Sequence, residues 1–306
     1  MIQPTLPEIE SIEKAGGVAI ETTPDSDWVL VAFGRAWVSD SQEGVYSFDA
    51  RTGRALGTVR LSRPCASMDE GFGSVWTLTC GPTGVARIDP VERKVTGRVD
   101  LPVGDDGEYS LGAGEGAVWA IADGDDCMRC VVARIDPETV KVTERFDVPR
   151  GATAIRAGLG GLWLTYFDLD EVLRVDPSTG EVVATIPVAD GPRFLNVGEG
   201  GVWVMAQKDG AACHIDPAED RLLGCTVVDP DGIFGGDIST GERFVWLRAS
   251  NELVAQIDPS TGEVVRRIGD PEASGGVGAG SGQLWLVAHA EVAPDQWVAT
   301  LYRVPL

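Results

Sequence analysis

The chain has 306 residues, of which 47 are Asp or Glu and 25 are Lys or Arg, so its formal net charge at pH 7 is −22. A surface of this sign repels phosphate groups, and the sequence has no Lys and Arg clusters, which argues against binding of nucleic acid or an anionic membrane. No apolar run approaches about 18 residues, so the sequence contains no candidate membrane-spanning helix.

The N-terminal residues 1–15 are rich in Pro and charge and match no other part of the chain. We expect them to form a tail or linker ahead of one domain over residues 16–306. The segment contains no signal peptide, and a mature exported chain would have lost one.

From residue 17 onward the chain repeats a unit in which a turn glycine precedes an apolar residue and a tryptophan. The repeat tryptophans recur at intervals of 39 to 44 residues: Trp37, Trp76, Trp119, Trp163, Trp203, Trp246 and Trp285. In the first six units an Asp, usually followed by Pro, comes mostly 12 or 13 residues later. A period of about 40 residues indicates an array of supersecondary units.

Each unit consists of four short predicted strands, A to D, separated by Gly and Pro turns. In the fourth unit the strands are residues 153–157, 162–166, 172–176 and 181–188. Seven such units stacked around an axis bury faces that one unit alone would expose. The sequence therefore predicts an all-β fold, a seven-bladed β-propeller with four antiparallel strands per blade.

Both chain ends are predicted to contribute to blade seven. The seventh unit has strands around Trp285 and at residues 300–304, and the sequence then ends without a D strand. Residues 17–22 precede the first repeat tryptophan at the spacing of an outer strand. We expect them to close the ring. We also expect the repeat tryptophans to fill the space between sheets, the alternative being a ring of ligand-stacking aromatics.

The six cysteines fall into three local pairs on this strand plan: Cys65 with Cys80, Cys127 with Cys130, and Cys213 with Cys225. The first pair flanks the A–B turn of blade two, and the third faces across the C–D turn of blade five, where opposed Cβ atoms are within disulfide reach. The second pair forms the motif CMRC, for which half a zinc site or a redox pair is the alternative. Paired cysteines are typical of an oxidising compartment, so we expect a secreted, periplasmic or cell-surface protein.

Two kinds of segment resemble a known group of propellers. They are VVATIPVADGPRFLNVGEGGVWV at residues 182–204 and the DPSTGEVV segments at residues 176–183 and 258–265. They resemble the YVTN-type repeat propellers, a broad group that has no sharp boundary with the streptogramin (virginiamycin B) lyases. The resemblance covers nearly the whole chain and implies the seven-bladed fold. It does not imply one function, because the group includes binding proteins, enzymes and sensor domains.

In such propellers the D–A and B–C loops gather on one face around the axis, and variable loops on a rigid frame are where function usually lies. The candidate ligand-binding residues are aromatic and arginine side chains at the starts of A strands or near the ends of B strands: Trp28, Tyr109, Tyr166, Arg193, Phe194 and Arg248. The favoured hypothesis is a monomeric, extracytoplasmic protein that binds a small molecule or a peptide in this funnel.

Two loops on the same face offer oxygen ligands of the kind that Ca²⁺ or Mg²⁺ prefers. Asp123 and Asp125 lie in the loop of blade three, and Glu291 lies in that of blade seven, beside His289. The alternative is a set of ordinary acidic loops. The resemblance to streptogramin lyases, which place His and Glu around Mg²⁺, implies a second hypothesis. This is a divalent-metal-dependent lyase or lactone hydrolase with His289 as general base and Glu291 as a metal ligand. The other histidine, His214, falls in a C strand.

Overall fold

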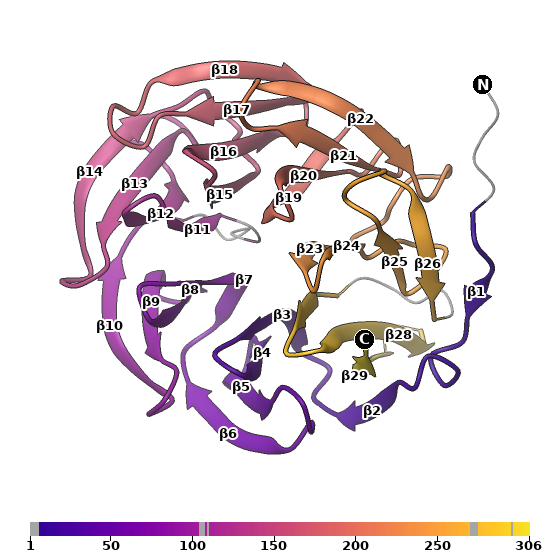
Figure 1. Cartoon of the computed structure of the whole chain (residues 1–306). Coiled ribbons are helices and arrows are strands. Elements are labelled where there is room, and N and C mark those ends of the chain that lie inside the picture. Colours follow the sequence, from indigo (N-terminus) through magenta and orange to yellow (C-terminus); the bar gives the residue numbers. More distant parts are fainter. Residues whose placement is uncertain (1–5, 104–107, 109, 270–274, 295) are drawn as a thin grey trace.

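The computed structural model describes residues 6–103, 108, 110–269, 275–294 and 296–306. The described residues form 29 β-strands and no helix, arranged as seven sheets around a central axis (Figure 1). In each sheet the strands that follow one another in the chain pair antiparallel. The predicted all-β, seven-bladed propeller with four antiparallel strands per blade is therefore confirmed.

In blades one to six, strand order from the axis to the rim follows the chain. Blades one and two contain β3 (Ser26–Ala32), β4 (Arg35–Asp40), β5 (Gly44–Asp49), β6 (Ala55–Arg60), β7 (Pro64–Gly71), β8 (Ser74–Cys80), β9 (Thr83–Asp89) and β10 (Lys94–Asp100). Blades three and four contain β11 (Leu111–Gly114), β12 (Ala117–Ala122), β13 (Val131–Asp136), β14 (Lys141–Asp147), β15 (Ala154–Gly158), β16 (Gly161–Tyr166), β17 (Glu171–Val175) and β18 (Val182–Pro187). Blades five and six contain β19 (Pro192–Gly198), β20 (Gly201–Ala206), β21 (Ala211–Asp216), β22 (Arg221–Val227), β23 (Ile238–Gly241), β24 (Phe244–Leu247), β25 (Val254–Ile257) and β26 (Val264–Ile268).

Blade seven is built from both ends of the chain. Its inner strands are β27 (Val277–Gly280), β28 (Gln283–Ala293) and β29 (Gln296–Pro305). Its outer strand is β2 (Val18–Glu21), which pairs antiparallel with β29 and places Ile20 opposite Leu301. The predicted ring closure by an N-terminal outer strand is confirmed.

Part of the segment expected as a tail forms a strand on blade six. Strand β1 (Ile9–Glu10) pairs parallel with β26 as a fifth strand (Figure 1). The carboxylate of Glu10 lies 2.7 Å from the guanidinium of Arg266, and its backbone carbonyl accepts a hydrogen bond from Gly269. The N-terminal segment is therefore anchored to the outer edge of the ring at this point.

The repeat tryptophans lie in the second strand of each blade and are among the largest fully buried side chains. Most donate the indole N–H to a backbone carbonyl at 2.9–3.2 Å, and the donors are Trp37, Trp76, Trp119, Trp163, Trp246 and Trp285. Trp203 instead stacks on His214, with 3.9 Å between ring centres. Their role in packing between sheets is confirmed.

The Asp of the second repeat signal is also structural. In blade four, Asp176 Oδ1 accepts hydrogen bonds from the backbone N–H of Ser178 at 2.7 Å and from its hydroxyl at 2.5 Å. These bonds stabilise the ionised form and lower the pKa of Asp176. The Asp residues of the other C–D turns accept equivalent bonds: Asp49, Asp89, Asp136, Asp216 and Asp258.

The A–B turns share one backbone geometry. Each places two successive residues at positive φ: Phe33-Gly34, Phe72-Gly73, Glu115-Gly116, Leu159-Gly160, Glu199-Gly200, Glu242-Arg243 and Ser281-Gly282. Two-residue turns of this kind match the twist of the flanking strands and favour Gly, Asn or Asp. Six blades have Gly at the second position, and blade six has Arg243 there, at φ 70°.

Candidate functional site

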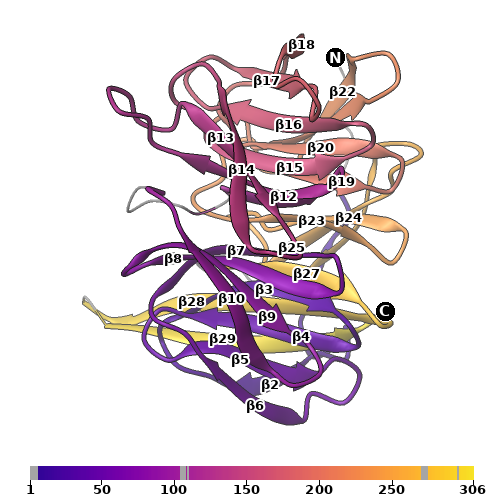
Figure 2. The same ribbon diagram turned by 90° about the vertical axis from the view of Figure 1, so that its left-hand side faces the viewer.

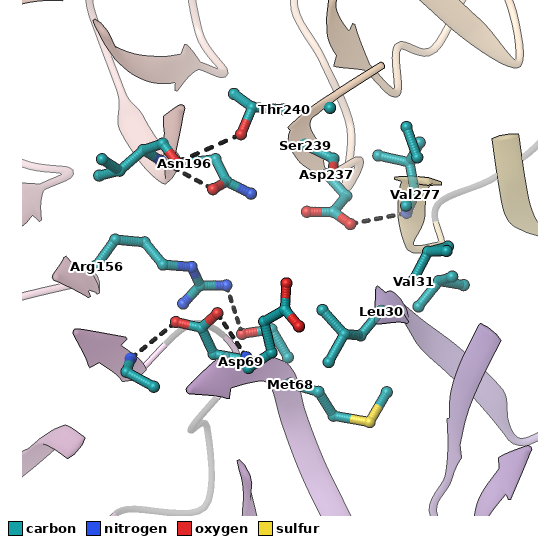
Figure 3. A pocket seen from close by; sticks show the side chains of 18 of the residues that line it. Leu30, Val31, Met68, Asp69, Arg156, Asn196, Asp237, Ser239, Thr240 and Val277 are labelled. Carbon is teal, nitrogen blue, oxygen red and sulfur yellow. Dashed lines mark hydrogen bonds between the residues drawn. The ribbon is translucent and has the colours of Figure 1, made fainter. Parts of the chain in front are cut away.

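A cavity of about 430 Å³ lies on the axis of the ring and is lined by the innermost strands of all seven blades (Figure 3). This volume falls in the range of small-molecule binding sites. Figure 3 shows Asp69, Arg156, Asn196 and Asp237 pointing into the same space from four different blades. We call this space the axial cavity.

The central side chains of the axial cavity occupy one register position. In every blade the residue seven positions before the repeat tryptophan pairs with it across the A–B hairpin: Leu30, Asp69, Gly112, Arg156, Asn196, Ser239 and Gly278. Asp69, Arg156 and Asn196 were not among the predicted site residues. A search of the sequence for polar residues seven positions before each repeat tryptophan, within an otherwise apolar strand, would have found these three residues.

Arg156 is the positive charge of the axial cavity and connects three blades. Its side chain is 5% exposed. Nη1 donates to the carbonyls of Ile155, at 3.0 Å, and Leu111, and Nη2 donates to Ser67 Oγ at 3.1 Å. The guanidinium lowers the pKa of Asp69, but burial has the larger effect and raises the pKa of this carboxyl overall.

Three carboxylates line the same cavity. Asp69 accepts hydrogen bonds at 2.8 Å from the backbone N–H groups of Glu70 and Ala113. Asp237, which is buried, accepts one from Val277 N–H at 2.8 Å. The carboxylate of Glu70 has no hydrogen bond or ion pair with the rest of the described chain, and its pKa is raised by burial and then by neighbouring Asp69. Among the described residues that line the cavity, one guanidinium stands against three carboxylates, and this excess of negative charge favours a cation.

The axial passage is covered on the face of the D–A and B–C loops. Trp28 and Phe194 come from blades one and five, which are not neighbours, and their rings meet edge to face at 5.5 Å. The guanidinium of Arg193 lies 5.2 Å from the centre of the Phe194 ring and donates from Nε to Glu108 Oε2 at 3.1 Å. These four side chains line a small cavity of about 60 Å³. Trp28 also lines a second cavity of about 260 Å³.

The axial cavity opens on the opposite face, where the A–B turns lie. In every innermost strand the residue eight positions before the tryptophan is buried: Val29, Met68, Leu111, Ile155, Leu195, Ile238 and Val277. The residue two positions further along, nearer the A–B turn, is partly or fully exposed in every blade: Val31, Glu70, Ala113, Ala157, Val197, Thr240 and Ala279. Exposure therefore rises towards the A–B turns.

The structure brings together only some of the predicted ligand-binding residues. Trp28, Arg193 and Phe194 form the cover described above. Tyr166 is buried and donates its hydroxyl hydrogen to Pro149 O at 3.0 Å, and burial raises its pKa. Arg248 is fully buried and donates from Nε to Gly275 O at 3.3 Å. Tyr109 lies outside the described residues.

The predicted loop of blade seven is a paired hairpin instead. Strands β28 and β29 continue beyond the body of the ring (Figure 2), with His289 opposite Ala299 and Glu291 opposite Trp297. The β-branched and aromatic residues of this segment favour such pairing. His289 Nε2 lies 2.8 Å from Ser26 O, beside a second cavity of about 260 Å³.

The predicted metal ligands come from separate blades. Asp123 and Asp125 follow β12 in blade three, and Asp123 Oδ1 accepts a hydrogen bond from the Arg129 backbone N–H at 2.8 Å. Glu291 belongs to blade seven, which does not neighbour blade three. Over the described residues no group of three or more His, Cys, Asp or Glu side chains is placed to hold a metal ion. The metal site and the role of His289 as general base stay predictions.

All three predicted disulfides are confirmed: Cys65–Cys80, Cys127–Cys130 and Cys213–Cys225. Cys213 and Cys225 are directly opposed in β21 and β22, as the strand plan required. Three disulfides without a free cysteine indicate an oxidising, extracytoplasmic environment. No described segment forms a helix with the length and apolar character needed to cross a bilayer.

Comparisons with known proteins support the fold. No family model and no curated protein sequence matches the chain. The structure is similar to the WD40 repeats of RRP9, with a TM-score of 0.75 and 9% identity over 95% of this chain and 97% of that one. It is also similar to the β-propeller domain of Myceliophteria thermophila Cps50 (Swd1), with a TM-score of 0.71 and 15% identity over 94% and 98% of the two chains. Hydrazine synthase of Kuenenia stuttgartiensis matches with a TM-score of 0.67 and 13% identity over 92% and 96%.

The TM-scores show that the chain shares a β-propeller architecture with WD40-type structural neighbours, and identities of 9% and 15% show nothing finer. The resemblance to YVTN-type propellers and streptogramin lyases stays a prediction.

Proposed function

We propose that this protein is a binding propeller of an extracytoplasmic compartment and that its ligand carries a positive charge into the axial cavity. A β-propeller with WD40-type neighbours suggests a binding or scaffolding role. The observation that carries the finer proposal is the lining of the cavity, where Asp69, Glu70 and Asp237 outnumber Arg156.

The chemistry of the lining selects a guanidinium or ammonium group. The Glu70 carboxylate has no partner elsewhere in the described chain, so a bound cation would supply its first charged hydrogen bond. Asn196 and Ser239 add polar side chains at the same level, and Leu30 and Val197 offer apolar contacts for the stem of the ligand. A cation would also relieve the repulsion between Glu70 and Asp69.

The proposed entrance is on the A–B turn face rather than in the funnel expected from the sequence. Trp28 and Phe194 contact each other over the axis on the loop side, and their side chains are 7% and 2% exposed. Rings that are already packed together offer little surface to a ligand. The cavity walls become more exposed in the other direction, towards Glu70.

The test is calorimetric titration of the wild-type protein with arginine amide and with its analogue citrulline amide, both acetylated at the α-amino group so that the first carries a charged guanidinium and the second is uncharged. The names arginine amide and citrulline amide stand for these acetylated probes. We expect binding of the first and none of the second. Glu70→Gln should weaken binding of arginine amide at least about tenfold, because a charge-assisted hydrogen bond contributes about 1.5–3 kcal/mol. Glu181, in the C–D turn of blade four, is exposed on the outer part of the same face, so Glu181→Gln is the matched control. Equal binding of both amides, or equal effects of both variants, would contradict the proposal.

A further inference from the structure

Two exposed phenylalanines lie in A–B turns, on the face towards which the axial cavity opens. Phe33 and Phe72 occupy the first position of the A–B turns of blades one and two, and their exposed fractions are 44% and 47%. Leu159 occupies the equivalent position in blade four and is 44% exposed. We call these three residues the apolar rim.

The turn geometry does not favour these residues. Phe33 and Phe72 both have φ 54°, in the left-handed region where a non-Gly residue costs roughly 1–2 kcal/mol. A large apolar ring that is also exposed gains little burial energy to offset this cost. The two aromatic side chains therefore have no evident role in the stability of the turns.

Other blades use the same position for a structural contact. Glu115, Glu199 and Glu242 each accept a hydrogen bond, at 2.9–3.1 Å, from a backbone N–H of the next A–B turn around the ring. These glutamates connect neighbouring turns. Phe33, Phe72 and Leu159 cannot accept this hydrogen bond, so the turns of blades one, two and four depart from the pattern seen in blades three, five and six.

Chain connectivity places the apolar rim beside the charged wall of the cavity. Val31 and Glu70 line the cavity, and Phe33 and Phe72 follow each of them by two residues in the same hairpins. Blades one and two are neighbours, and their inner strands β3 and β7 contact each other. Two exposed aromatic residues thus lie two positions beyond the cavity lining in neighbouring blades, and Phe72 shares its hairpin with Glu70.

We propose that the ligand is a polypeptide segment that inserts one Arg or Lys side chain towards Glu70 and packs flanking apolar residues on Phe33 and Phe72. This inference rests on the proposed function and names its ligand class. The cavity alone would satisfy a small cation, whereas the rim adds contact area that only a ligand extending out of the cavity can cover. Contacts between aromatic rings typically contribute more to the binding free energy than their buried area alone would give.

Charge favours a basic partner over a second copy of this chain. Each copy carries a formal net charge of −22, so association through the acidic mouth is opposed by repulsion. A basic segment is instead attracted to this surface and oriented by it. The partner is therefore expected to be a separate polypeptide that carries a local positive charge.

The probe is the fluorescein-labelled peptide Gly-Leu-Phe-Arg-Leu-Gly, measured by fluorescence anisotropy against the full chain. We expect it to bind at least about tenfold more tightly than arginine amide, a gain of about 1.4 kcal/mol. Phe33→Asn with Phe72→Asn should remove this gain and leave the affinity for arginine amide within about twofold of wild type. Asn suits the first position of these turns, so the double variant is expected to fold.

The matched control is Phe234→Asn. Phe234 is 78% exposed in the D–A connection before β23, on the opposite face, so its replacement should leave peptide affinity unchanged. If the double variant binds the peptide as tightly as wild type, or if wild type prefers arginine amide, the polypeptide inference fails while the cavity proposal stands. If wild type binds neither probe, the proposed function itself fails. A wild-type dimer in sedimentation that the double variant loses would assign the rim to a second copy and overturn the inference.

Discussion

The charge balance of the axial cavity can be tested through its one guanidinium. Arg156→Leu removes the side-chain hydrogen bonds by which blade four reaches Leu111 O of blade three and Ser67 Oγ of blade two. It also leaves Asp69 without the positive charge that now lowers its pKa. The substitution should therefore lower stability and, because it removes a positive charge, raise the affinity of the cavity for cations.

The expected loss of stability is large for one residue. A hydrogen bond of a charged group contributes about 1.5–3 kcal/mol, so loss of the two bonds that reach Leu111 and Ser67 should cost about 3–6 kcal/mol. At about 2 °C per kcal/mol for a chain of this size, the melting temperature should fall by about 6–12 °C. Burial raises the pKa of Asp69, so its ionised form destabilises the folded state at neutral pH, and this cost disappears as pH falls through the raised pKa. The deficit of the variant should therefore shrink in acid.

Differential scanning calorimetry at pH 7 and at lower pH measures both effects. Arg156→Lys is the control, because it keeps a positive charge and loses the planar fork that reaches two other blades. It should fall between wild type and Arg156→Leu. A Leu variant that melts within about 1 °C of wild type at pH 7, or a deficit that grows in acid, would refute this description of the cavity.

Further predictions concern a turn, a disulfide and a titration. Arg243→Gly should stabilise the protein by about 0.5–1 kcal/mol in urea denaturation, because Gly adopts positive φ without steric cost, and a loss of stability would contradict this. Cys65→Ala with Cys80→Ala opens a loop with a sequence separation of 15 and should cost about 3 kcal/mol, whereas removal of the bridge in CMRC should cost about half as much by the same chain-entropy reasoning. Affinity for arginine amide should fall as pH drops through the raised pKa of Glu70, since protons then compete with the cation, and calorimetric titrations that give one affinity from about pH 7 to about pH 4 would disagree.

The fold could be predicted because its signals repeat in every blade. Each sheet needs a large side chain between itself and its neighbour, and Trp119 or Trp163 fills that role at a fixed spacing. Each C–D turn needs a side-chain acceptor such as Asp176, which made the Asp-Pro pairs periodic. Disulfide pairing followed from the same hairpins, because Cys213 and Cys225 can be aligned once the strands are drawn.

The axial cavity could not be located in the same way, because its residues do not repeat. Arg156 is a single charged residue in the otherwise apolar strand β15. Its role in the cavity becomes visible only from its pairing with Trp163 and from its hydrogen bonds to other blades. The contact between Trp28 and Phe194 depends on the distance between blades one and five across the axis. A local sequence pattern contains no information about this distance. The aromatic residues near the loops therefore led to the prediction of an open ligand-binding funnel, whereas Trp28 and Phe194 contact each other and cover the axial passage.

The most direct measurement is a crystal structure of the protein soaked in arginine amide. We predict electron density for the guanidinium in the axial cavity, with nitrogen atoms about 2.7–3.2 Å from carboxylate oxygens of Glu70 or Asp69. Density on the loop face beside Arg193 and His289, with none in the axial cavity, would contradict the proposed site.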